Sequence, residues 1–158
     1  MLANGLINSK LIYCIQLYGS AADYLIHFLQ VQQNKAARIV TRLDNRTETA
    51  ELLRQVGWLS VRQMYIYHSI LLVFKVQQQQ RPEYLCDKFR RNFPYETRRS
   101  KNNFFSISKV PRTEVSKKAF TYSSIILWNA LPLDMKNATG LEQFKTQLKD
   151  WVMKSNPH

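Results

Sequence analysis

The sequence predicts a mainly α-helical fold, a helical bundle of about six or seven helices with at most a small β element near residues 104–112. Apolar residues recur at intervals of three and four along most of the 158-residue chain, which is the spacing of a helix face. The chain has only four Gly and five Pro, too few for an all-β fold with many turns. Hydrophobic residues make up 45% of it, so a chain of this length can bury a core.

The first two helices are expected over residues 6–18 and 22–42. Gly19 should end the first one, because glycine readily takes the left-handed conformation that closes many helices. The second is the clearest amphipathic helix, with apolar residues on one face and basic residues on another. Its expected buried stripe comprises Leu25, Leu29, Gln32, Ala36, Ile39 and Leu43.

Two further helices are expected over residues 49–56 and 60–76, and Gly57 should end the first of them. Ser60 and Gln63 match the capping box, in which each side chain bonds the backbone N–H of the other residue. The helix behind this box is apolar on nearly all sides, which predicts a buried central helix.

A short helix and a short strand are expected next. Pro82 suits the first turn of the helix, whose expected buried residues are Tyr84, Leu85 and Phe89. Apolar residues that alternate with polar ones from Phe105 onward predict a strand, and Pro111 should end it.

Two helices are expected at the C-terminal end. The first covers residues 116–131 and is closed by Pro132, with a buried face made of Ala119, Tyr122, Ile126 and Ala130. The second starts at a capping box formed by Thr139 and Glu142. Its expected buried residues are Leu141, Phe144, Leu148 and Trp151.

These elements are expected to form a single domain over residues 1–158, because no internal repeat and no long linker divides the chain. Three subregions follow each other within it. Residues 1–91 are helical, residues 92–115 form a basic loop and residues 116–158 hold the C-terminal helices.

The charge of the chain predicts a polyanionic partner. Lys and Arg number 23 against 11 Asp and Glu, which gives a net charge of +12. Such an excess attracts nucleic acid, an anionic membrane surface or an acidic protein. Residues 81–118 carry eleven basic and four acidic residues, more than half of the net charge.

The expected helix over residues 22–42 carries the first group of candidate nucleic-acid-binding residues. Lys35, Arg38 and Arg42 share one stripe of that helix, where they could follow a phosphate backbone without reading sequence. The alternative is a solvated helix face, which is the more common role of a basic stripe.

Two more groups of basic residues are candidates for the same contact. In the loop, basic residues flank Phe93 and Tyr95, and this mixture suits single-stranded nucleic acid, whose bases stack on rings. Lys117 and Lys118 lie at the expected start of a helix, where cations oppose the macrodipole. An ordinary basic surface is the alternative for both groups. The loop residues are Arg90, Arg91, Arg98, Arg99 and Lys101.

The sequence holds no recognisable catalytic or metal-binding motif. Cys14 and Cys86 belong to no Cys-x-x-Cys motif and no Cys/His cluster, so we expect buried thiols in a reducing compartment. His68, Trp128 and Trp151 lie on apolar helix faces and are expected to pack in the core. No glycine-rich phosphate loop occurs. We therefore expect no cofactor, no small-molecule substrate and no enzyme activity.

A membrane partner is not expected either. The N-terminal segment does not read as a signal peptide, and the longest apolar stretch, residues 70–74, is far too short to cross a bilayer. The expected location is intracellular, in the nucleus, the cytoplasm or both.

Six strings of the sequence, taken in order, resemble one protein family. Residues 29–39 read LQVQQNKAARI, and the string over residues 120–132 contains LWNALP at positions 127–132. Together the strings resemble the C-terminal thumb and post-thumb region of non-LTR (LINE-type, jockey-like) retrotransposon reverse transcriptases, over essentially the whole chain. The other strings are residues 6–13 with Tyr18 and Gly19, residues 53–63, residues 82–85 with Thr97 and Arg98, and residues 141–151.

The resemblance implies a non-catalytic role beside a polymerase. Members of this family polymerise DNA on RNA with a pair of adjacent metal-binding Asp residues, and this chain has no Asp-Asp pair. Residues 1–91 would be thumb-like helices that help to hold RNA template, cDNA or target DNA, next to an upstream polymerase palm. The alternatives are a protein-interaction or scaffold module, and a domesticated or functionless remnant of the element.

Overall fold

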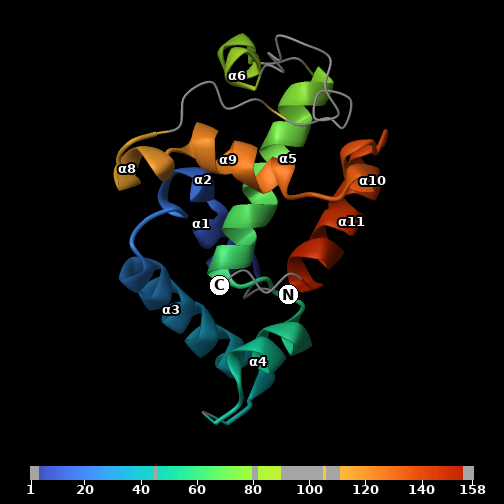
Figure 1. Ribbon diagram of the computed structural model, residues 1–158. Coiled ribbons are helices and arrows are strands. Elements are labelled where there is room, and N and C mark those ends of the chain that lie inside the picture. The colour runs from blue at the N-terminus through green and yellow to red at the C-terminus, as the bar shows by residue number, and fades with distance from the viewer. Residues whose placement is uncertain (1–3, 45, 80–81, 90–104, 106–110, 155–158) are drawn as a thin grey trace. The chain divides into compact units, whose positions relative to one another are not determined.

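The computed structural model describes residues 4–44, 46–79, 82–89, 105 and 111–154 (Figure 1). These residues form ten α-helices and one π-helical segment, and no strand occurs among them. The predicted mainly α-helical fold is therefore confirmed. The described residues form more helices than the six or seven predicted, because two expected helices are broken and one further short helix is present. Contacts divide the chain into two compact units, residues 1–65 and 66–155, while the single-domain organisation stays a prediction.

The first unit begins with a broken helix rather than the continuous helix predicted over residues 6–18. Cys14 interrupts it with a φ of 54°, and a left-handed residue that carries a Cβ costs about 1–2 kcal/mol. The break buries Ile15 but leaves Cys14 exposed, so the prediction of a buried Cys14 thiol is wrong. The pieces are η1 (Asn4–Asn8), α1 (Ser9–Ile12) and α2 (Ile15–Tyr18).

Gly19 follows α2, as predicted, but for a different physical reason. Its φ is −65°, so it does not use the left-handed conformation. A Cβ at this position would collide with Cδ2 of the buried Tyr65 ring. Glycine is needed here because the Tyr65 ring packs directly against the backbone.

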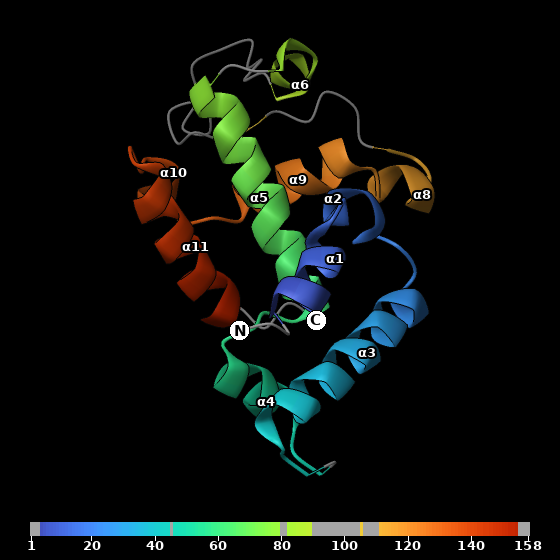
Figure 2. The same ribbon diagram turned by 180° about the vertical axis from the view of Figure 1, so that it is seen from behind.

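The first unit is built mainly from α3 (Asp23–Thr41) and α4 (Thr49–Val56), which lie side by side in Figure 1 and in Figure 2. Both agree with the predicted helices, and Gly57 ends α4 with a φ of 70°. Small side chains on α3 let the two helices approach closely. Their common core consists of Ala36, Ala37, Leu52, Leu53 and Trp58.

The buried face of α3 is not the predicted stripe. Leu25 is 45% exposed and Ile39 is 80% exposed, although both were expected in the core. The helix is instead rotated so that polar residues point inward and find partners. The buried residues are Ile26, Gln33, Asn34, Ala36 and Ala37.

Helix α5 (Val61–Gln79) starts at the predicted capping box and is buried on several sides, as expected. The backbone N–H of Ser60 donates to Oε1 of Gln63 over 3.0 Å, and the N–H of Gln63 donates to Oγ of Ser60 over 3.2 Å. This reciprocal pair satisfies two donors that the first turn of a helix leaves without an intrahelical partner.

Among the residues that the structure describes, the second unit contains the remainder of α5 and five further helices. Their bounds are α6 (Glu83–Lys88), α8 (Glu114–Lys117), α9 (Phe120–Asn129), α10 (Leu133–Lys136) and α11 (Leu141–Lys154). α6 follows Pro82 as predicted and buries Phe89 just after its end. Tyr84, however, is exposed, which contradicts the prediction that it is buried.

An aromatic cluster forms the core of the second unit. Trp128 is fully buried, and its ring centroid lies 5.7 Å from that of Phe105 and 6.2 Å from that of Phe144. Phe144 stacks on Phe74 with centroids 4.0 Å apart. Asn129 fixes Phe105 by bonding both its backbone N–H and its carbonyl. Residues 106–110 of the predicted strand lie outside the described residues.

The helix predicted over residues 116–131 is two helices, α8 and α9, that meet at Lys118 and Ala119. Thr113 caps α8 by accepting a bond from the backbone N–H of Ser116 over 3.2 Å. The predicted buried face is wrong, because burying the large Trp128 ring sets a different rotation of α9. Ala119, Ile126 and Ala130 are exposed, whereas Ser124, Ile125, Trp128 and Leu131 are buried.

Two polar features complete the second unit. Lys136 is buried, and its Nζ donates to the carbonyl of Asn129, the last residue of α9, over 3.0 Å. Burial lowers the pKa of Lys136.

α11 begins at Leu141 and buries Phe144 and Leu148 as predicted. The capping box of Thr139 and Glu142 stays a prediction, and Glu142 pairs with Lys145 at 2.6 Å.

Candidate nucleic-acid interface

The predicted basic stripe of α3 is only partly continuous. Lys35 is exposed, whereas Arg38 is half-buried. Arg42 lies just beyond the helix with a φ of 57°, and its backbone N–H donates to the carbonyl of Arg38 over 2.8 Å. Lys35 and Arg42 therefore reach solvent. A cation near Arg42 is also favoured by the negative end of the helix dipole.

The outward side of α3 is apolar as well as basic. Four exposed residues follow each other at intervals of four, seven and four positions, so helical geometry places them on one stripe. This stripe, which we call the outer face of α3, consists of Tyr24, Phe28, Lys35 and Ile39. The side chain of Tyr24 is 73% exposed and that of Phe28 is 60% exposed. α3 is labelled in Figure 2 and is drawn in a lighter blue than α1 and α2. The spacing of apolar residues did not reveal this face, because it placed Leu25 and Ile39 in the core.

Lys35 on the outer face and Arg42 beyond its end have no acidic partner within the part of the chain that the structure describes. Asp23 is the only acidic residue of α3, and it pairs with Arg62 at 2.8 Å. Among the described residues, none forms an ion pair with Lys35 or Arg42. Both charges are available to an external anion.

The polar side of α3 holds the helix in this rotation. Nε2 of Gln33 donates to the carbonyl of Leu59 over 2.9 Å, and Nδ2 of Asn34 donates to Oγ1 of Thr49 over 2.9 Å. Oε1 of Gln30 accepts a bond from the backbone N–H of Val61 over 2.8 Å. The spacing of Gln30, Gln33 and Asn34 at i, i+3 and i+4 was the signal in the sequence that could have revealed this buried polar face.

Lys117 and Lys118 lie at the end of α8 rather than at the start of the helix predicted over residues 116–131, and Lys118 directly precedes Ala119, the N-cap of α9. Lys117 lies in the last turn of α8 and Lys118 caps its C-terminus, where cations are favoured. Nζ of Lys117 also lies 2.7 Å from Oε1 of Glu114, and this hydrogen bond raises the pKa of Lys117. Their position is therefore explained without a ligand, although both side chains remain exposed.

The predicted loop group lies outside the described residues. It comprises Arg90, Arg91, Arg98, Arg99 and Lys101. Seven of the 23 basic residues but only one of the 11 acidic residues fall in the undescribed ranges. Contact of the five loop residues with nucleic acid stays a prediction.

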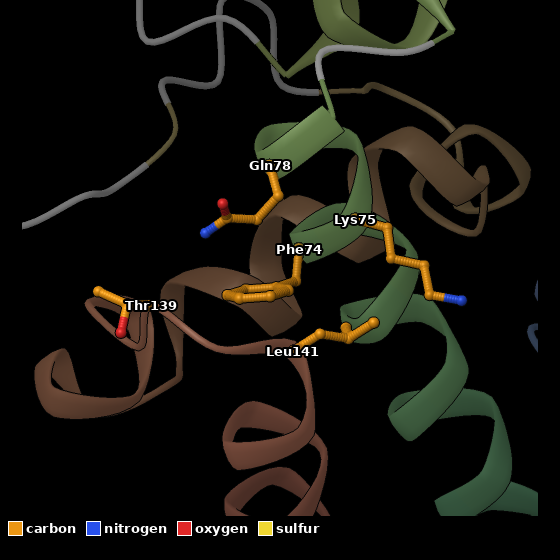
Figure 3. Close-up of a pocket in the computed structure, with 5 residues that line it drawn as sticks. All are labelled: Phe74, Lys75, Gln78, Thr139 and Leu141. Atoms are coloured by element: carbon orange, nitrogen blue, oxygen red, sulfur yellow. The ribbon is translucent and has the colours of Figure 1, made fainter.

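A small pocket lies in the second unit between α5 and the start of α11 (Figure 3). Its volume is about 140 Å³, and pockets for cofactors or drug-sized ligands usually have about 300–1,000 Å³. Figure 3 shows the amine of Lys75 pointing away from Phe74 and Thr139. The pocket therefore offers no argument for a bound cofactor.

Within the described ranges, no group of three or more His, Cys, Asp or Glu side chains is placed to hold a metal ion. None of the helices there combines the length and the apolar character that a membrane crossing requires.

His68 is a half-buried side chain of α5 whose protonation should affect stability. Its ring packs edge-to-face on Tyr67, with centroids 5.1 Å apart. Burial lowers the pKa of His68 below its usual value of 6.5, and the positive charge of Lys75 lowers it further.

We expect acid to destabilise the second unit through His68. Below about pH 6.5, His68 becomes protonated in the unfolded chain but stays neutral in the folded chain. The free energy of unfolding therefore falls as the pH decreases toward the pKa of His68 in the folded chain. Urea denaturation between pH 7.5 and pH 5 would measure this, and His68→Gln should flatten the dependence. His27→Gln is the control, because His27 is exposed. An equal effect of both variants would contradict the role of burial.

The chain was compared with family models, with curated proteins and with solved structures, and nothing matches it in any of the three.

Proposed function

We propose that the chain is a non-catalytic nucleic-acid-binding module, the C-terminal part of a retrotransposon RNA-directed DNA polymerase that helps to hold template, primer or target DNA. The observation that carries the proposal is the pair of exposed cations at Lys35 and Arg42, without an ion-pair partner among the described residues, in a chain of net charge +12. The family assignment rests on the resemblance of the sequence strings.

The proposed chemistry is phosphate neutralisation. Lys and Arg side chains displace the counterions condensed on a nucleic-acid backbone, and the released ions drive binding. Such contacts position a protein on a strand without reading its sequence. The module would thus add affinity and orientation to a polymerase whose catalytic carboxylates lie in another domain.

The proposal is tested by charge reversal at α3. We expect Lys35→Glu combined with Arg42→Glu to weaken binding of fluorescein-labelled single-stranded RNA and DNA at least about tenfold. The slope of log affinity against log salt should become shallower by about 1.4, because two phosphate contacts are lost from a single strand. Fluorescence anisotropy of the full chain between about 50 and 200 mM salt measures both quantities.

A matched control separates a specific site from diffuse attraction. Lys149→Glu with Lys154→Glu makes the same change in net charge on exposed residues of α11. An equal loss in this control would show that total charge alone governs binding and would contradict a site on α3. No binding of the unmodified chain even at low salt would overturn the proposed function.

A second candidate function is docking on another protein, and a specific observation favours it. The first unit exposes large apolar residues outside α3 as well, namely Leu6, Tyr13 and Leu17. Contiguous exposed apolar surface often marks a protein interface. In an intact element the upstream polymerase palm would be such a partner. Docking of this kind would depend only weakly on salt, in contrast to phosphate contacts.

A further inference from the structure

The outer face of α3 combines two exposed aromatic rings with an exposed cation. Tyr24 and Phe28 are one helical turn apart, so their side chains are neighbours about 6 Å apart along the helix axis. Lys35 follows Phe28 by seven residues, two turns farther along the same stripe. We propose that this face binds single-stranded nucleic acid, with unpaired bases stacked on Tyr24 and Phe28 and a phosphate held by Lys35.

The exposure of the two rings favours nucleobases as the ligand. Neither ring contributes to the core of the first unit, and each leaves more than half of its surface in water. Stacking of a base on an aromatic side chain contributes about 1–3 kcal/mol and accepts any base. In a duplex the faces of the bases already stack on each other, so exposed rings on a helix select unpaired strands.

The charge of the face favours a polyanion over other occupants. Lys35 lies on the stripe and Arg42 at its end, while Asp23 is engaged by Arg62. A second copy of the chain would bring like charges together across a symmetric contact, with +12 on each partner. A single strand supplies both the anionic groups and the flat apolar surfaces that this face can contact.

A tryptophan reporter tests stacking directly. The three native Trp residues are buried or half-buried, so Phe28→Trp adds an exposed indole. We expect oligo(dT) and oligo(U) to quench its fluorescence at low salt, because their bases would stack on the indole. A length of about 20 nucleotides suffices, since it exceeds the site size of many single-strand-binding folds. A duplex of equal length should leave the indole unquenched. Quenching by the duplex, or a blue shift only with phosphatidylserine vesicles, would overturn the inference.

Ring removal tests the energetic contribution. Tyr24→Ala with Phe28→Ala should weaken binding to oligo(dT) about tenfold to a hundredfold, while duplex binding stays within about twofold. Tyr24→Phe with Phe28→Tyr keeps both rings and should retain the affinity. Ile39→Ala removes an exposed apolar side chain from the same face without removing a ring. If it weakens binding as much as ring removal does, the contact is not stacking and the inference fails.

The inference rests on the proposed function, but the two can fail separately. If charge reversal at Lys35 and Arg42 weakens binding and ring removal does not, the inference is wrong and the proposed function stands. If the unmodified chain binds neither single strands nor duplex, both are wrong. Circular dichroism of each variant shows that it is folded, which is expected because the substituted side chains are exposed. Tyr24→Trp replaces Phe28→Trp as the reporter if the latter does not fold.

Discussion

Replacing Trp128 by alanine is expected to lower the free energy of unfolding by about 3–5 kcal/mol. Trp128 is the largest of the fully buried side chains among the described residues, and its ring lies against Phe105 and Phe144 in the second unit. Removal of an indole from such a site loses its transfer free energy and leaves a cavity that the stacked Phe74 and Phe144 rings fill only in part. Urea denaturation followed by circular dichroism gives the measurement.

Trp151→Ala provides the comparison for Trp128→Ala. The same side chain is deleted, but Trp151 is only half-buried in α11, so the expected loss is clearly smaller. If the two variants lost equal stability, the aromatic cluster around Trp128 would not be the core of the second unit. The full burial of Trp128 also has a functional consequence, since a ring without exposed surface cannot stack on a base of a ligand.

Local sequence chemistry predicted where several helices begin and end. The capping box of Ser60 and Gln63, the end of α4 at Gly57 and the span of α3 were all confirmed. Each depends on interactions between residues a few positions apart, which the sequence displays directly. The break at Cys14 could not be predicted in this way, because neither glycine nor proline marks it.

The rotation of a helix depends on partners that are distant in the sequence, and there the pattern of apolar residues failed. In α3, two amides are buried because their partners lie 15 and 26 residues farther along the chain. These bonds turn Ile39 and Phe28 outward, although hydrophobicity alone places such residues in the core. The sequence thus revealed the basic residues of the candidate site but not the aromatic residues that share its surface.

The same polar contacts lead to the second large effect, which is expected for Gln33→Leu. Gln33 is fully buried, its Nε2 donates to the carbonyl of Leu59, and its Oε1 accepts a bond from Nε2 of Gln30 over 2.9 Å. Leucine has a similar size but leaves these two partners one bond short, together with Oδ1 of the buried Asn8, to which Nε2 of Gln33 also donates over 3.3 Å. We expect a loss of about 2–4 kcal/mol in the free energy of unfolding, because each buried polar group without its partner costs about 1–3 kcal/mol.

Gln32→Leu is the matched control, one residue earlier in α3. Gln32 is exposed, so this variant should change stability by less than about 0.5 kcal/mol. Equal stability of the two variants would mean that the buried amide does not hold α3 in its rotation.

If Gln33→Leu is destabilised as expected, its affinity for single strands should fall as well, because the amide contacts that orient Tyr24, Phe28 and Lys35 toward solvent are weakened. The stability of the buried polar side of α3 and the binding of its outer face would then be two consequences of one helix orientation.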